Sequence, residues 1–68
     1  MNFPILKYFA FSHLPERLQE VSKPFGELAT LMVESIPHNN ETGPEISAGL
    51  RKLLEAKDCF VRASLNKI

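Results

Sequence analysis

An apolar stripe with helical spacing runs through the first half of the chain, and a proline stands in its middle. Its members are three or four residues apart, which predicts one face of an α-helix: Leu14, Leu18, Val21, Phe25, Leu28, Met32 and Ile36. Pro24 would remove a hydrogen bond from such a helix and clash with the preceding turn, at a cost of about 3 kcal/mol. Ser22 is a good helix N-cap. The stripe therefore predicts a short helix over about 14–21 and a longer one from Ser22 to about Ser35, with a bend between Ser22 and Pro24.

A turn and a further helix are expected after this stripe. Residues 36–45, IPHNNETGPE, contain two prolines, two asparagines and a glycine, a composition typical of turns. The last helix is expected to begin near Pro44 and to reach about Ser64. Its apolar residues are Ile46, Leu50, Leu53, Leu54, Phe60 and Val61. We therefore expect an all-α fold in one domain over residues 1–68, with a short N-terminal helix and an antiparallel hairpin of two helices.

The chain is too short to bury a large core. A domain of 68 residues leaves much of its surface exposed, and such chains usually need a disulfide, a metal, close helix packing or self-association. Cys59 is the only cysteine, so no disulfide forms within the chain. His13, His38 and Cys59 lack the spacing of metal ligands, and we expect neither a metal site nor a cofactor. Helix packing and assembly into a helical homo-oligomer are the remaining means of stabilisation.

The charge balance excludes several classes of partner. Eight basic and eight acidic residues cancel, which argues against a general DNA or RNA binder and against an anionic membrane surface. A small anionic ligand held by a few local positive groups is compatible with this balance. No run of 18 apolar residues could span a membrane, and the apolar N-terminus lacks the basic region and cleavage site of a signal peptide. With one free cysteine, these features predict a cytoplasmic protein.

Aromatic residues are concentrated in an N-terminal arm, residues 1–13, ahead of the helices expected over 14–64. The arm holds four of the six aromatic residues of the chain: Phe3, Tyr8, Phe9 and Phe11. It has no clear helical period, so at most a short strand or turn is expected there. Because a small core usually places its rings on regular elements, we expect these rings to pack against something else.

Two residues are candidates for ligand binding, Tyr8 in the arm and Lys23 at the expected bend. Tyr8 is either a core or interface residue or a flat platform on which a nucleobase stacks, an interaction worth about 1–3 kcal/mol per base. Lys23 is either a solvated surface charge or an anion-binding group. Its expected place at a helix start, where free backbone N–H groups and the helix dipole favour an anion, supports the second interpretation.

The other polar residues carry weaker signals. His13 is expected to hydrogen-bond the backbone at the start of the first helix, and Cys59 to be a buried, inert thiol. Asp58 and Arg62 are expected to form an i,i+4 ion pair. The basic residues of the last helix are expected to form a solvated face, and in a symmetric oligomer copies of Arg62 could converge to bind an anion. These basic residues are Arg51, Lys52, Lys57 and Arg62. We find no catalytic grouping and predict that the protein is not an enzyme.

Two stretches resemble a known family. They read KYFAFSHLPERLQEVSKPFGELA and LRKLLEAKDCFVRA, and the resemblance covers about residues 7–63. The pattern is an aromatic pair, then His-Leu-Pro, Leu-Gln and Ser-x-Pro-Phe, and a Leu-Leu-Glu-Ala-Lys-Asp…Val-Arg-Ala ending. It is similar to that of the phage anti-CBASS cyclic-oligonucleotide sponges, whose domain is called the Acb/Tad hairpin domain.

The resemblance implies a binding function without catalysis. Members of this family are small helical proteins that assemble as compact hexamers in the cytoplasm of the infected bacterium. They sequester cyclic nucleotide messengers such as cGAMP, so that the messenger does not activate its effector. Cyclic dinucleotides bind between protomers, and some members hold cyclic trinucleotides at a separate site.

The resemblance also assigns site residues. The tyrosine and the lysine of the cyclic dinucleotide site match Tyr8 and Lys23, and the arginine of the cyclic trinucleotide site matches Arg62. The alternative function that we retain is a small oligomeric helical module that acts on a host protein through its apolar arm. An enzyme that degrades a messenger is a third hypothesis with less support from the residues.

Overall fold

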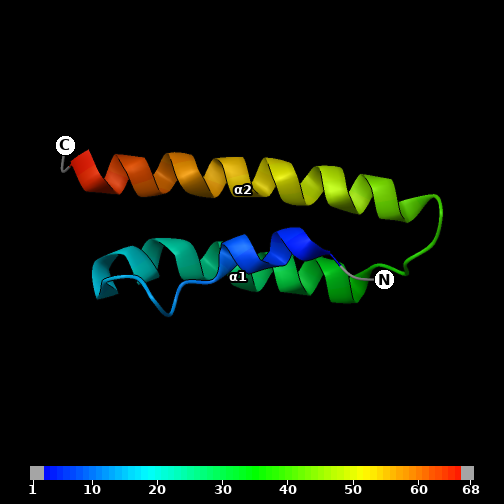
Figure 1. Ribbon diagram of the computed structural model, residues 1–68, viewed down its shortest axis with the longest axis horizontal. Coiled ribbons are helices and arrows are strands. Elements are labelled where there is room, and N and C mark those ends of the chain that lie inside the picture. Colours follow the sequence, from blue (N-terminus) through cyan, green and yellow to red (C-terminus); the bar gives the residue numbers. More distant parts are fainter. Residues whose placement is uncertain (1–2, 67–68) are drawn as a thin grey trace.

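The computed structural model describes residues 3–66 and shows three helical elements (Figure 1). A short 3₁₀ helix, η1, spans Pro4–Phe9. Two long α-helices follow, α1 over Glu16–Ser35 and α2 over Thr42–Asn66. No strand is present in the described part of the chain. The expectation of an all-helical chain with two long helices is confirmed. The short N-terminal element is a 3₁₀ helix in the arm, where at most a short strand or turn is expected, and not the short helix predicted over about 14–21.

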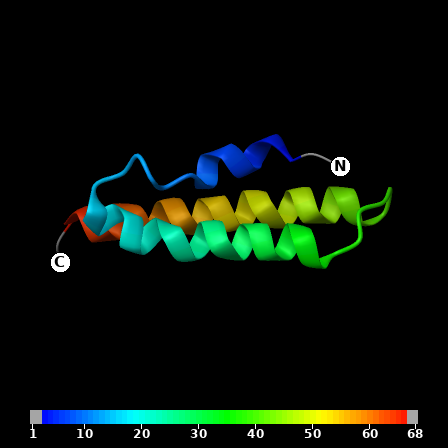
Figure 2. The same cartoon turned by 90° about the horizontal axis from the view of Figure 1, so that it is seen from below.

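The three elements form a hairpin with the arm laid along it. Helices α1 and α2 run antiparallel side by side, and η1 lies over one face of the pair (Figures 1 and 2). Because the chain turns back after η1, this element runs antiparallel to α1 and parallel to α2. The molecule is elongated, measuring 42 × 19 × 17 Å along its principal axes. The arm covers one face of the hairpin.

Helix α1 is continuous through Pro24, so the prediction of two helices separated by a bend is wrong. Pro24 has no N–H, so it removes only the hydrogen bond that this position would make to the carbonyl of Glu20. Full burial of one large apolar side chain contributes about 1.5–3 kcal/mol. Helix α1 packs against both other elements, with Phe25 and Val33 partly buried against the core. These tertiary contacts outweigh the local cost of the proline. Ser22, predicted as an N-cap, lies inside the helix and is fully buried.

Small residues form the most deeply buried face of α1. Ser22 and Ala29 have no exposed surface, and Gly26 lies between them on the same face of the helix. A Cβ placed on Gly26 would lie 3.0 Å from the carbonyl oxygen of Phe9. The small side chains therefore let the backbone of the arm approach α1 closely. By contrast, the second half of the apolar stripe is partly exposed, with Leu28 at 42%.

Aromatic rings of the arm supply much of the core. Among the residues that the structure describes, the buried apolar ones are Phe3, Phe9, Ala29, Ile46 and Leu50. The ring of Phe3 also meets the ring of His38 edge-on, with centroids 5.2 Å apart. The expectation that the arm's rings pack against something else is therefore wrong for Phe3 and Phe9. Their burial completes a core that two helices could not build alone.

The start of α1 is held by a glutamine and not by the predicted histidine. The Nε2 atom of Gln19 donates to the carbonyl of Leu14 at 2.7 Å. His13 is exposed, and its side chain makes no hydrogen bond within residues 3–66. Gln19 lies one turn inside the helix, and its side chain reaches back to the loop that leads into α1. Within the described chain, the side chain of His13 makes no such hydrogen bond.

The turn between the long helices is organised by Asn39. Its Oδ1 atom accepts hydrogen bonds from the backbone N–H groups of Glu41 and Thr42, at 2.8 and 2.9 Å. Thr42 in turn donates its hydroxyl to the carbonyl of Pro37 at 2.6 Å. This capping allows α2 to begin at Thr42, two residues before the predicted start near Pro44.

Aromatic stacking joins the hairpin far from its turn. The rings of Phe25 and Phe60 have centroids 5.8 Å apart and planes inclined at 27°, a stacked arrangement that links α1 to α2. Within the described residues, neither long helix is apolar enough over 18 residues to cross a membrane.

Candidate functional site

Tyr8 lies at the end of η1 with its side chain outward. The side chain is 57% exposed, while its neighbour Phe9 is buried. The ammonium group of Lys7 lies 5.2 Å from the centroid of the Tyr8 ring, within cation–π range. The arm therefore presents one flat ring and one cation on its surface, while the next ring anchors it in the core.

Lys57 holds the backbone of this part of the arm. Its Nζ atom donates to the carbonyl oxygen of Tyr8 at 2.7 Å and lies 5.9 Å from the centroid of the Phe9 ring. Asp58 on the same helix lies 3.8 Å away, at the limit of an ion pair. Lys57 is only 9% exposed. The prediction that it belongs to a solvated face is wrong, because the arm covers it.

A signal for the burial of Lys57 is present in the sequence. Leu50, Leu53 and Leu54 lie on the inner face of α2, and Lys57 follows them at the next helical spacing. A lysine that interrupts an apolar stripe in this way can extend its chain along the apolar surface and donate at its end. The prediction that groups Lys57 with the three other basic residues of α2 does not use this spacing.

Lys23 lies in the interior of α1 and is exposed. The predicted helix start at this position does not exist, so free backbone N–H groups and a helix dipole end are absent beside it. Any positive potential at Lys23 therefore comes from its own ammonium group. Lys23 precedes Gly26 by one helical turn, and Gly26 lies against the backbone of the arm.

No direct contact joins the two predicted dinucleotide-binding residues within one chain. Among residues 3–66, no hydrogen bond, ion pair or cation–π contact connects Tyr8 with Lys23. Both side chains are exposed. A ligand that contacts both would therefore contact them from the solvent side, or would join groups of neighbouring copies.

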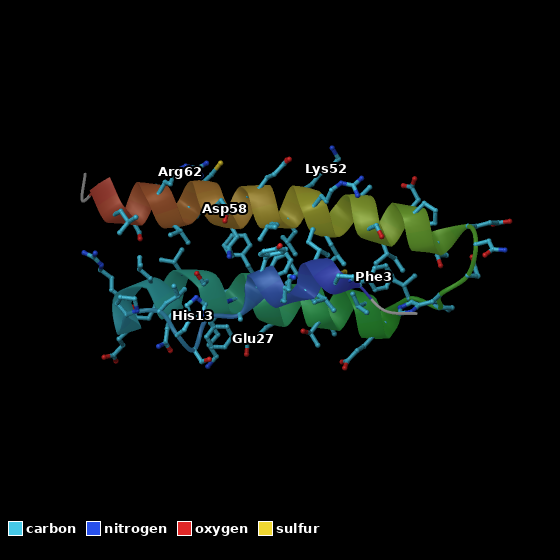
Figure 3. All side chains as sticks on the ribbon, in the orientation of Figure 1. Phe3, His13, Glu27, Lys52, Asp58 and Arg62 are labelled. Carbon is cyan, nitrogen blue, oxygen red and sulfur yellow. The ribbon has the colours of Figure 1, made fainter. Side chains whose placement is uncertain are left out.

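Arg62 lies near the end of α2, on the side that faces away from α1 (Figure 3). Its Nη2 atom lies 3.3 Å from the Sγ atom of Cys59. The predicted ion pair between Asp58 and Arg62 is not formed, because Asp58 lies beside Lys57. Cys59 is exposed, which corrects the expectation of a buried thiol. Arg62 is also exposed and free to meet an anion.

An apolar groove of about 590 Å³ lies between the two long helices. No residue of η1 lines it, so it opens on a part of the hairpin that the arm leaves uncovered. Its apolar lining residues are Leu28, Met32, Ile36, Ile46, Leu50 and Leu53. None of Tyr8, Lys23 and Arg62 contributes to it. The groove is therefore separate from the predicted ligand-binding residues.

The described residues present several groups that could bind a ligand or a partner. Within residues 3–66, no group of three His, Cys, Asp or Glu side chains is placed to hold a metal ion. The surface presents the exposed Tyr8 ring, the ammonium group of Lys7 beside it and an apolar groove. These features suit the binding of a planar, anionic molecule and of a protein surface.

Comparisons with protein-family models, with curated proteins and with solved structures found no match to this chain.

Proposed function

We propose that this protein binds and sequesters cyclic oligonucleotide second messengers, and so blocks bacterial CBASS anti-phage signalling in the cytoplasm of an infected cell. The proposal starts from the resemblance of about residues 7–63 to the sponge family. In this proposal the protein acts by tight binding and carries out no reaction. Its ligands are cyclic dinucleotides such as cGAMP at one site and cyclic trinucleotides at a second.

The observation that carries the proposal is the presentation of Tyr8. Its ring is 57% exposed, yet its own carbonyl is held by Lys57 at 2.7 Å. An exposed aromatic ring on an anchored backbone is suited to stacking on a nucleobase. Since the backbone beside the ring is already ordered, less conformational entropy is lost on binding.

Local positive charge complements this ring. A cyclic dinucleotide carries two phosphate charges, which a protein with eight basic and eight acidic residues can meet only with local groups. Lys23 supplies an exposed ammonium group on α1, and Lys7 supplies one at the Tyr8 ring. We propose that Lys23 contacts a phosphate or a base carbonyl of the ligand.

The proposed site lies between copies of the chain. No contact joins Tyr8 to Lys23 within one chain, whereas a neighbouring copy can bring the second residue to the ligand. The uncovered groove between α1 and α2 gives a reason for assembly, because Leu28 and Met32 remain 42% and 39% exposed there. We propose a homo-oligomer, with the hexamer implied by the resemblance, in which a second copy covers this groove.

Arg62 is proposed as the cyclic trinucleotide-binding residue. It is exposed on the side of α2 that faces away from α1 (Figure 3). Copies of one arginine around a symmetry axis would create a positive site for a ligand of matching symmetry. This second site is independent of Tyr8 and Lys23.

Calorimetry of the full chain with a panel of cyclic di- and trinucleotides tests the proposal. Tight binding of a dinucleotide, with the ligand recovered intact after the protein is denatured, is the expected result. Recovery of a cleaved ligand would instead indicate an enzyme. Absence of binding to every member of the panel would overturn the proposal.

The groove also favours one alternative function, a helical module that acts on a host protein. Its lining is mainly apolar, and its volume of about 590 Å³ could receive side chains of a partner. This alternative predicts a stoichiometric complex with a host protein and no nucleotide binding. Affinity capture from a host lysate, followed by reconstitution with the purified partner, separates the two functions.

A further inference from the structure

We propose that Lys57 is a positioning residue that aims the Tyr8 ring at the ligand. This inference rests on the proposed function for its consequence in binding, while its structural part stands on the geometry alone. The residue pair is 49 positions apart in sequence, and the hydrogen bond of 2.7 Å joins the middle of α2 to the arm. Lys57 is not among the residues proposed above to contact a ligand.

An ammonium group at this position of α2 is costly to bury. Lys57 is 9% exposed on the inner face of α2, where an apolar side chain would pack without losing water. Burying a charge is unfavourable unless it is hydrogen-bonded and paired. Its carboxylate neighbour Asp58 is on the same helix and lies 3.8 Å away, which is long for an ion pair. The main compensation is the carbonyl of Tyr8.

The hydrogen bond from Lys57 restrains the backbone at Tyr8. Fixing the carbonyl oxygen fixes the plane of the peptide group between Tyr8 and Phe9. The Phe9 ring is buried, whereas the Tyr8 side chain is 57% exposed to solvent. Lys57 therefore controls the direction of the ring while lying beneath the backbone that carries it.

The next carbonyl of the arm, that of Phe9, lies against α1. The carbonyl oxygen of Phe9 lies against Gly26, at the distance where a Cβ would be in close contact. Two consecutive carbonyls of the arm thus meet different helices, Tyr8 on α2 and Phe9 on α1. Of these two contacts only that of Lys57 is a hydrogen bond, so its removal should loosen the backbone at Tyr8 while the buried Phe9 ring still anchors the arm.

The test compares Lys57→Met with Lys52→Met. Methionine keeps most of the apolar length of lysine and removes the donor, and Lys52 is an exposed lysine of the same helix that projects away from α1 (Figure 3). Tyr8 is the only tyrosine and the chain has no tryptophan, so intrinsic fluorescence reports on this ring alone. The readouts are fluorescence anisotropy, acrylamide quenching and cyclic dinucleotide affinity, with far-UV circular dichroism as the check on folding.

Lys57→Met is expected to lower the anisotropy of Tyr8, raise its quenching and weaken dinucleotide binding about threefold to tenfold. Lys52→Met is expected to change none of these. Unchanged anisotropy and quenching in Lys57→Met would overturn the inference. So would a loosened Tyr8 with unchanged affinity, provided that the unmodified protein binds the ligand. If the unmodified protein binds no cyclic nucleotide, the proposed function fails and fluorescence alone decides the role of Lys57.

A second measurement on the unmodified protein covers the case in which Lys57→Met does not fold. Limited acetylation of the native chain, read by mass spectrometry, compares the rates at which lysines react. Lys57 is expected to react at least about tenfold more slowly than Lys7, Lys23 and Lys52, because its ammonium group is covered and hydrogen-bonded. Equal reactivity of Lys57 and Lys52 would overturn the inference.

Discussion

The carbonyl oxygen of Phe9 lies 3.0 Å from the point where a Cβ on Gly26 would stand. This approach is what allows the arm to lie on α1 with its backbone almost in contact with the helix. A larger residue at position 26 would meet backbone, which moves less easily than the end of a flexible side chain. The absence of a side chain at Gly26 therefore decides how close the arm packs.

Two glycine substitutions test this relationship. In a helix, alanine is favoured over glycine by about 0.5–1 kcal/mol. Gly49→Ala should show this gain, because within one chain the added Cβ meets no atom within 4 Å beyond the neighbouring residues and the helix's own backbone. In Gly26→Ala the same gain is offset by displacement of the arm, so its free energy of unfolding should be lower than that of Gly49→Ala by about 1 kcal/mol or more.

Urea denaturation measures the difference in free energy of unfolding between the two variants. It is carried out at a protein concentration where both have the same oligomeric state. Tyr8 fluorescence should change in Gly26→Ala alone, since the arm is moved only there. Equal stabilisation by both substitutions would show that the arm shifts at no cost.

Replacing the proline within α1 tests its energetic role. Pro24→Ala restores an N–H donor to the carbonyl of Glu20 and removes the clash of the ring, in a helix that is already continuous. The free energy of unfolding should rise by about 1–3 kcal/mol. Thermal denaturation followed by circular dichroism gives the value. A fall in stability would mean that the proline ring makes a packing contact of its own.

Removing Tyr8 or Lys23 should weaken the proposed ligand binding. Tyr8→Ala removes a stacking contact worth about 1–3 kcal/mol, which corresponds to roughly a fivefold to 150-fold loss of dinucleotide affinity. Lys23→Ala removes an ammonium group. Its dinucleotide affinity should therefore be lower, and that affinity should depend less steeply on salt concentration. Calorimetry measures both, with Tyr8→Phe and Lys52→Ala as controls that should bind normally. Unchanged affinity in both alanine variants would exclude this site.

A charge in the groove should disrupt self-association. Met32→Glu places a carboxylate among the lining residues of the groove, whereas Leu31→Glu places one on an exposed residue that does not line it. Met32 and Leu31 are 39% and 54% exposed, so neither substitution buries a charge within one chain. Sedimentation should show dissociation of the Met32→Glu variant alone. Equal masses for both variants and the unmodified chain would place the interface elsewhere.

Local sequence signals predicted the hairpin and misjudged the arm. The turn composition of residues 36–45 placed the break between the long helices correctly, because turn residues act within a few positions. The local cost of the proline at position 24 predicts a bend that is absent, since contacts with distant residues outweigh that cost. For the candidate site, Tyr8 and Lys23 are both exposed as required, but the expected helix start beside Lys23 is absent.

The sequence by itself determined the helical character, the two long helices and the turn that separates them, because these depend on spacing and on turn residues close along the chain. Only the tertiary structure decided that α1 passes through Pro24, that Phe3 and Phe9 enter the core, and that Lys57 is covered by the arm. These outcomes depend on contacts between residues far apart in sequence. The hydrogen bond from Lys57 to Tyr8 is the clearest case, since it exists only once the arm has packed on the hairpin.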